Sequence, residues 1–331
     1  MIFYYRGETF NYGGILSCSG ISTYPTIRGS RQGDPICDHW CTRLYNNCSI
    51  VCLCDGCGWG PQAQQAAIKA SRAFVEYIND NLIFDIIEDV GHHLLLAASA
   101  AHNAIIKGYE DDIWSAKSTT ILGGILVPLQ PLSPDEPRYG FTFISIGDCK
   151  AFYYSKRTGD VTDLTAGNRH SVTDATDPGG RIGPWIGEGA PDLRNLKLYF
   201  VGCNVGDIVF LATDGVHDNF DPQQLGKLPK EVSTQLEGED WKEYFGNSSA
   251  DKVKNTFRVK LLRETIHASS RDVTPVEITS SVINHCVNLT KKCRDFMENN
   301  PQIKKQPSDI KEYPGKFDHT TIVALSVGSP K

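Results

Sequence analysis

The sequence predicts an α+β fold, in which helices are segregated from mainly antiparallel strands. The first observation is the order of its apolar patterns: strand-length runs, two helical stretches, more strand-length runs, two more helices and one last strand. The second is that no internal repeat or low-complexity linker divides the 331 residues. The third is that the last strand must return to a sheet begun near the N-terminus. We therefore expect a single domain over residues 1–331, with its core at about 20–327.

In the first half of the chain, the pattern of apolar residues changes from strand-like to helical. Short apolar runs broken by Gly and Pro occupy residues 12 to 60 and predict strands. At Pro61 the pattern becomes helical, because Pro suits a first helical turn and apolar residues three and four apart follow it as far as Ile78. A second helical stretch covers residues 86 to 106.

Strand-length apolar runs then resume, and their ends are marked by turn residues. They cover residues 119–127, 139–146, 150–154, 196–201 and 207–213, with a four-proline loop at 128–137. Two further helices are predicted at 251–268 and 275–297. A polar loop at 299–316 leads into the last strand, 320–327.

Composition and charge exclude several functional classes. Lys and Arg number 33 against 39 Asp and Glu, a net charge of -6, which argues against a nucleic-acid or anionic-membrane binder. No apolar run approaches the ~20 residues of a membrane span, and no signal-like segment opens the chain. We therefore expect reduced cysteines and a cytoplasmic or nuclear protein. Because no large apolar face is evident, we expect a monomer.

The cysteines between residues 37 and 57 raise the question of a zinc-binding interaction module. Cys54-x-x-Cys57 has the spacing of a zinc knuckle, and Cys37 and Cys41 supply a second pair. However, Cys52 and Cys54 lie inside an apolar, strand-like run, and cysteine often packs as a small buried hydrophobe. Core packing is the favoured interpretation, with the zinc module kept as an alternative.

Aspartates at the ends of predicted strands are the most informative feature. Asp55 and Asp214 each follow an apolar run and precede Gly, Asp148 follows Gly147, and Asp318 precedes the last strand. One such Asp is usually a turn residue. If the strands are neighbours in layered sheets, their ends lie at one edge and the carboxylates converge. Clustered carboxylates repel one another, and an oxygen-only donor set selects a hard cation, Mg²⁺ or Mn²⁺.

Five segments, in order along the chain, resemble the metal-dependent protein serine/threonine phosphatases of the PPM type (protein phosphatase 2C). They are Asp55-Gly56, Ser118-Thr119-Thr120, Gly147-Asp148-Cys-Lys-Ala-Phe, the stretch Asp207 to Asp218, and Asp318-His-Thr-Thr-Ile-Val. The resemblance covers about residues 20 to 326. It implies a four-layer α-β-β-α sandwich, two central mainly antiparallel sheets with helix pairs outside, and metal ions at one end.

The resemblance also implies a function and a set of site residues. The implied reaction is hydrolysis of phosphoserine and phosphothreonine monoesters on protein substrates by a hydroxide that bridges two metal ions. The implied ligands of the two core Mg²⁺ or Mn²⁺ ions are Asp55, Gly56, Asp214 and Asp318. Asp148 and Asp218, together with Asp214, are implied for a looser third ion, although Asp218 is equally explained as a helix N-cap. Asp55 and Asp214 are thus the central catalytic aspartates.

The chain departs from the family pattern near its N-terminus. Gly29-Ser-Arg31 resembles the segment whose arginine binds phosphate, but the acids that follow, Asp34 and Asp38, have altered spacing. Arg31 is the favoured phosphate ligand, and Arg28 is its competitor.

A second departure lies beside the first metal aspartate. Cys57 stands where many relatives have a histidine thought to protonate the leaving group. These differences motivate an alternative function, a catalytically weak or inactive pseudophosphatase that serves as a phosphoprotein-binding scaffold. The Gly-rich segment 177–189 is interpreted either as a flap beside the site, with Arg181 and Trp185 near substrate, or as a surface loop.

Overall fold

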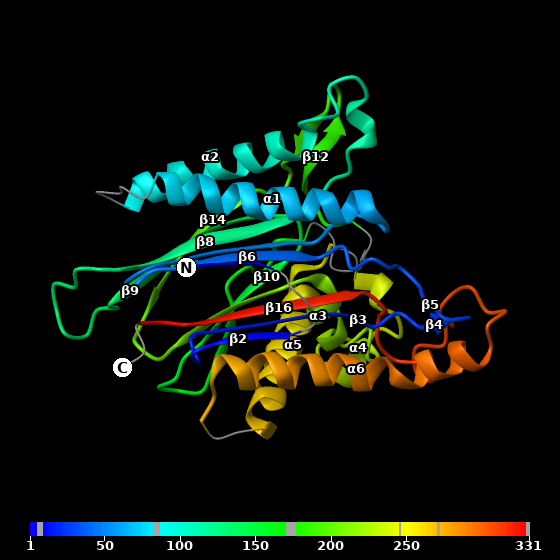
Figure 1. The fold of residues 1–331 in the computed structure, drawn as a ribbon. Coiled ribbons are helices and arrows are strands. Elements are labelled where there is room, and N and C mark those ends of the chain that lie inside the picture. The colour runs from blue at the N-terminus through cyan, green and yellow to red at the C-terminus, as the bar shows by residue number, and fades with distance from the viewer. Residues whose placement is uncertain (5–8, 82–86, 170–176, 245, 270–271, 329–331) are drawn as a thin grey trace.

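Two six-stranded antiparallel sheets pack face to face, and a pair of helices covers the outer face of each (Figure 1). The computed structural model describes the whole chain except residues 5–8, 82–86, 170–176, 245, 270–271 and 329–331. This arrangement confirms the α+β class and the four-layer sandwich expected from the resemblance.

The first sheet contains the strand that leads to Asp55. Its order is β1-β6-β7-β8-β9-β14, and every neighbouring pair is antiparallel. The strands are β1 (Ile2–Tyr4), β6 (His39–Leu44), β7 (Ser49–Cys54), β8 (Ile121–Pro128), β9 (Tyr139–Ile146) and β14 (Lys197–Cys203).

The second sheet contains the strands beside Asp214 and Asp318. Its order is β11-β10-β15-β16-β3-β2, again antiparallel throughout. The strands are β2 (Thr9–Tyr12), β3 (Leu16–Ser22), β10 (Lys150–Tyr154), β11 (Val161–Asp163), β15 (Ile208–Ala212) and β16 (His319–Ser326). The last strand returns to pair with β3.

The long helices lie where the sequence pattern places them. They are α1 (Pro61–Asp80) and α2 (Ile87–Ile106) on the first sheet, and α5 (Ser248–Ser269) and α6 (Pro275–Asn299) on the second. In α1, buried residues recur three and four apart, including Ala63, Ala67, Ala70 and Phe74. Thr274 caps α6 in a reciprocal capping box with Glu277, which fixes the start of that helix.

Shorter elements lie between the long strands and helices. They are β4 (Thr26–Ile27), β5 (Ser30–Arg31), η1 (Ile113–Ser115), β12 (Arg181–Ile186), β13 (Ala190–Asp192), α3 (Asp214–His217), η2 (Asp218–Phe220), α4 (Pro229–Val232) and η3 (Trp241–Tyr244). Strands β12 and β13 pair as an antiparallel hairpin, so much of the Gly-rich segment is a β-ribbon. In Figure 1 this ribbon stands beside one end of α2.

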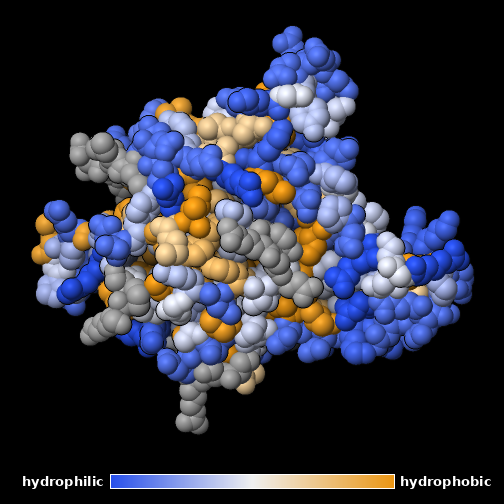
Figure 2. Space-filling view, viewed as in Figure 1, coloured by the Kyte–Doolittle hydropathy of each residue, from blue (hydrophilic) through white to orange (hydrophobic). Residues whose placement is uncertain are grey.

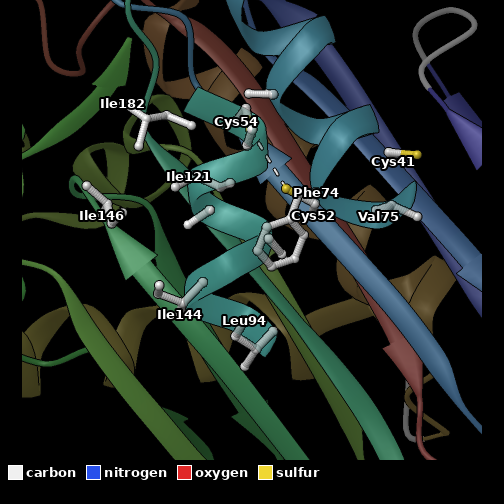
Figure 3. Close-up of a cluster of buried hydrophobic side chains, with 14 of the residues drawn as sticks. Cys41, Cys52, Cys54, Phe74, Val75, Leu94, Ile121, Ile144, Ile146 and Ile182 are labelled. Atoms are coloured by element: carbon white, nitrogen blue, oxygen red, sulfur yellow. Dashed lines mark hydrogen bonds between the residues drawn. The ribbon is translucent and has the colours of Figure 1, made fainter. Parts of the chain in front are cut away.

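Three apolar layers hold the sandwich together: one between α1–α2 and the first sheet, one between the sheets, and one between the second sheet and α5–α6. In the first layer Gly123 of β8 admits the Phe74 ring of α1, since a Cβ there would lie 2.5 Å from the ring. Cys41, Cys52 and Cys54 are fully buried among these apolar side chains (Figure 3), which confirms core packing for them.

The outer surface is mainly polar. Hydrophilic residues cover both ends of the face in Figure 2, and apolar side chains appear between them. Within the described part of the chain, none of the helices combines the length and apolar character needed to cross a bilayer.

A buried histidine in the first sheet makes stability depend on pH. Burial, assisted by Arg72, lowers the pKa of His39 to about 3. Because the unfolded side chain takes up a proton near pH 6.5 and the folded one does not, stability is full above that pH and falls below it.

We expect the difference in unfolding free energy between wild type and His39→Gln to shrink by about 2 kcal/mol from pH 7 to pH 5. Urea unfolding of both proteins at each pH measures this difference. A difference that stays constant over this range would show that His39 titrates normally in the folded protein.

Candidate functional site

The strand-end aspartates line one cavity of about 400 Å³. Asp55 follows β7, Asp148 follows β9, Asp214 follows β15, and Asp318 precedes β16. Gly56 lines the same cavity. The structure thus brings these five predicted site residues together from both sheets.

The Asp55–Gly56 backbone is held by the small-residue segment before β8. The Thr119 hydroxyl donates to the Asp55 carbonyl at 2.7 Å, and the Asp55 N–H donates to the Thr120 hydroxyl at 3.1 Å. Gly56 passes so close to other backbone that a Cβ would lie 2.5 Å from the Ala63 carbonyl oxygen and 2.9 Å from that of Cys37. Only glycine fits this position.

A lysine ammonium lies among three of the carboxylates. Lys316 Nζ is 2.6 Å from Asp214 Oδ2, 2.8 Å from Asp318 Oδ2 and 3.1 Å from Asp218 Oδ2. Burial lowers the pKa of Lys316, but these carboxylates outweigh burial and hold the pKa well above its usual value. Asp218 is buried beneath the cavity, where the lysine reaches it.

Arg169 is a second cation that contacts the same carboxylates. Its guanidinium donates to Asp218 Oδ1 at 2.9 Å and to Asp148 Oδ2 at 2.8 Å, and it lies 3.7 Å from Asp214. Burial would raise the pKa of Asp218, but Arg169 and then Lys316 bring that pKa well below its ordinary value. The pKa of Asp214 is lowered too, because Lys316 and Arg169 together overcome its burial.

Asp38 and Asp55 form the uncompensated side of the cluster. No Lys, Arg or His lies within ion-pair distance of either carboxylate among the described residues. Burial, reinforced by Asp318 and Asp214, raises the pKa of Asp38 to about 7. Burial followed by repulsion from Asp38 raises the pKa of Asp55 well above its ordinary value.

Hydrogen bonds satisfy the Asp38 carboxylate only in part. Its Oδ2 accepts a hydrogen bond from the Thr213 hydroxyl at 3.0 Å, whereas its buried Oδ1 has no partner of good hydrogen-bond geometry in the described part of the chain, and the nearby Thr321 hydroxyl lowers the pKa of Asp38 only partly. Its place beside the cluster was not among the expected site residues, although it is one of the two acids that follow Arg31 in the sequence.

A divalent ion fits the two sides of this cluster differently. The donors are oxygens, as Mg²⁺ and Mn²⁺ prefer, and the Asp55 side lacks a cation. On the other side Lys316 and Arg169 already engage Asp214, Asp218 and Asp318. As the described side chains stand, no group of three or more His, Cys, Asp or Glu is arranged to hold a metal ion on either side.

The arginine that lines the cavity is Arg181 of β12, whereas Arg31 and Arg28 lie in and beside the β4–β5 hairpin, outside the lining residues. Arg181 is 9% exposed, and its guanidinium lies 3.8 Å from the centre of the Trp185 indole ring, a cation–π contact. The alternation of Gly with a basic residue in segment 177–189 was the signal for this arginine.

Two further cavity residues are weak proton donors. Cys57 lines the cavity, but burial raises the pKa of its thiol. His319 uses both ring nitrogens in the fold: Nδ1 accepts from the Cys37 N–H at 3.3 Å, and Nε2 faces the Gly33 carbonyl at 3.0 Å. Burial lowers its pKa, so the ring is neutral and already satisfied.

Comparisons with known proteins agree with this fold. No family model matches the chain. The PP2C-like domain-containing protein CG9801 of Drosophila melanogaster is 29% identical over 213 residues, which is 61% of this chain and 28% of that protein. The chain therefore matches much less than two thirds of that relative's length.

A solved phosphatase structure shares the architecture. The photosystem II phosphatase PBCP aligns with a TM-score of 0.55 at 16% identity, over 95% of this chain and 100% of that one. The catalytic domain of the serine/threonine phosphatase PstP, solved with two manganese ions, aligns with a TM-score of 0.49 at 14% identity, over 95% and 99%. Sequence similarity to the Drosophila protein and the shared fold together confirm the resemblance to the PP2C-like, PPM-type phosphatase family.

Proposed function

We propose that this chain hydrolyses phosphoserine and phosphothreonine monoesters on proteins, with Mg²⁺ or Mn²⁺ bound on the Asp55 side of the cavity. The observation that carries the proposal is the uncompensated pair Asp38 and Asp55 beside a cavity lined by further carboxylates. A phosphate dianion would be repelled from such a cavity unless a cation entered with it. The resemblance to PP2C-like proteins supplies the substrate class.

The chain's own residues would divide the work of binding and positioning. Asp55 and the Gly56 carbonyl would hold the ion, which supplies Lewis acidity and activates water. Arg181 would bind the non-reacting phosphate oxygens through its fork of N–H donors. Trp185 positions Arg181 by stacking on its guanidinium. Because Cys57 is a poor proton donor, it would give little assistance to departure of the alkoxide leaving group.

A protein substrate is supported by a second hollow beside the first. This cavity of about 410 Å³ shares Cys57, Gly58 and Arg181 with the aspartate-lined cavity. Trp114 and Trp185 line it and remain half exposed, at 54% and 49%. Exposed aromatic side chains next to a phosphate-binding arginine are suited to the residues that flank a phosphorylated side chain.

A second candidate function is a phosphoprotein-binding domain without turnover. Two observations favour it: Cys57 in place of the family histidine, and the Lys316 ammonium among carboxylates expected to hold metal. Both would reduce catalysis while the fold and the cavity persist. Turnover separates the two candidates.

We expect wild-type protein to hydrolyse a phosphothreonine peptide with Mn²⁺ or Mg²⁺ but not with EDTA. Asp55→Asn should lower kcat/KM at least ~100-fold, because it removes a charged ligand from the uncompensated side. Released phosphate is the readout, and Asp135→Asn, at an exposed loop position, is the control. Folded wild type that shows no turnover at millimolar Mn²⁺ would exclude the hydrolase and leave the binding domain.

Restoring an imidazole at position 57 tests the leaving-group step. We expect Cys57→His to raise kcat by ~10²-fold or more, because a general acid typically contributes ~10²–10⁴-fold. The gain should be larger for a phosphothreonine peptide than for p-nitrophenyl phosphate, whose leaving group needs no proton. An equal change for both substrates would contradict a proton-transfer role.

We expect Mn²⁺ affinity to fall about tenfold per pH unit as pH decreases from 7 to 6, because ligands must lose protons to bind the ion and burial has raised their pKa values. Asp38→Asn should make this dependence shallower, since it removes a group with a pKa of about 7. Titration of Mn²⁺ at each pH measures both. An affinity independent of pH in this range would mean that these carboxylates are ionised throughout.

A further inference from the structure

Three carboxylates that the sequence assigns to metal ions converge on one ammonium group. An ammonium has three N–H donors, and Lys316 Nζ has three acceptors, on Asp214, Asp218 and Asp318. The distances of 2.6, 3.1 and 2.8 Å are those of charge-assisted hydrogen bonds.

The backbone holds Lys316 in this place. Its N–H donates to the Asn219 side-chain oxygen at 2.9 Å, and the Asn219 amide donates back to the Lys316 carbonyl at 3.1 Å. Asn219 is fully buried and also donates to the Gly215 carbonyl at 2.7 Å, which ties the lysine to the segment that carries Asp214 and Asp218. The fold therefore fixes the backbone from which the Lys316 side chain reaches the carboxylates.

Arg169 reinforces the same side of the cluster. Its guanidinium bridges Asp148 and Asp218, the two residues implied for a looser third ion. Every carboxylate expected to hold metal outside the Asp55–Gly56 pair is thus in an ion pair with Lys316 or Arg169. Among the described residues, Asp55 and Asp38 are the carboxylates of the cluster without such an ion pair.

We propose that Lys316 is a built-in replacement for a divalent ion at Asp214, Asp218 and Asp318, so that the chain binds one divalent ion fewer than the two-ion centre implied by its sequence. Lys316 supplies a fixed positive charge but no Lewis acidity, since an ammonium cannot coordinate water as a metal does. The inference rests on the proposed function only in taking this cavity as the active site.

The test compares the number of Mn²⁺ ions bound by metal-free full-length protein, measured from the electron paramagnetic resonance signal of free Mn²⁺. We expect Lys316→Ser to bind one more Mn²⁺ ion than wild type, because it leaves Asp318 without an ion pair and leaves Asp214 and Asp218 with Arg169 alone. Mn²⁺ should also raise the melting temperature of this variant more than that of wild type. Lys311→Ser, in the same loop and exposed, should match wild type in both measurements.

Equal numbers of Mn²⁺ ions bound by folded Lys316→Ser and wild type would overturn the proposal. If Lys316→Ser does not fold, the Asp218→Asn variant provides the test, because Lys316 still contacts Asp214 and Asp318 in that variant. An unchanged number of bound ions supports the proposal, and the loss of one ion overturns it. Failure of the proposed function would be a different result, namely a folded wild type that releases no phosphate. That result would not change the number of bound ions expected here.

Discussion

Mutual repulsion among buried aspartates is the constraint on which this site depends. The strand ends of two antiparallel sheets bring Asp55, Asp148, Asp214 and Asp318 to one cavity, and burial alone would push protons onto them. Lys316 and Arg169 relieve this repulsion on one side, where the pKa of Asp214 and that of Asp218 fall below their ordinary values. On the other side the pKa of Asp55 is raised. Burial and Asp214 also raise the pKa of Asp318 to about 7 despite its contact with Lys316, and burial raises the pKa of Asp148. Among the described residues, Asp55 and Asp38 are the members of the cluster without an ion pair.

The sandwich makes this arrangement rigid. Apolar layers on both sides of each sheet fix the strands, and the segment before β8 fixes the Asp55–Gly56 backbone through hydroxyl hydrogen bonds. Asn219 fixes the lysine in the same way. Because the carboxylates cannot move far apart, their repulsion has to be balanced by cations or protons. This is the physical reason that a lysine can hold a place expected for metal.

The sequence is sufficient to predict the fold and the acidic half of the site apart from Asp38. Helical periodicity after Pro61 and the apolar runs before Asp55, Asp148 and Asp214 are local signals, and each marks an element or junction found in the structure. The cationic half has no local signal. Lys316 and Arg169 lie in polar loops, and their roles arise from contacts with residues 98 and 49 positions away. Arg31 was predicted from a family-like motif, but its hairpin lies outside the cavity lining. Arg181 lines the cavity from the β12–β13 ribbon, whose sequence resembles a loop.

In this site the ammonium of Lys316, and not a metal ion, lies among Asp214, Asp218 and Asp318. The most direct measurement is anomalous diffraction at the manganese edge from crystals equilibrated with millimolar MnCl₂. The account predicts a manganese peak beside Asp55 and Gly56, with Lys316 Nζ in contact with all three carboxylates. A manganese peak among Asp214, Asp218 and Asp318, with Lys316 displaced into solvent, would contradict it.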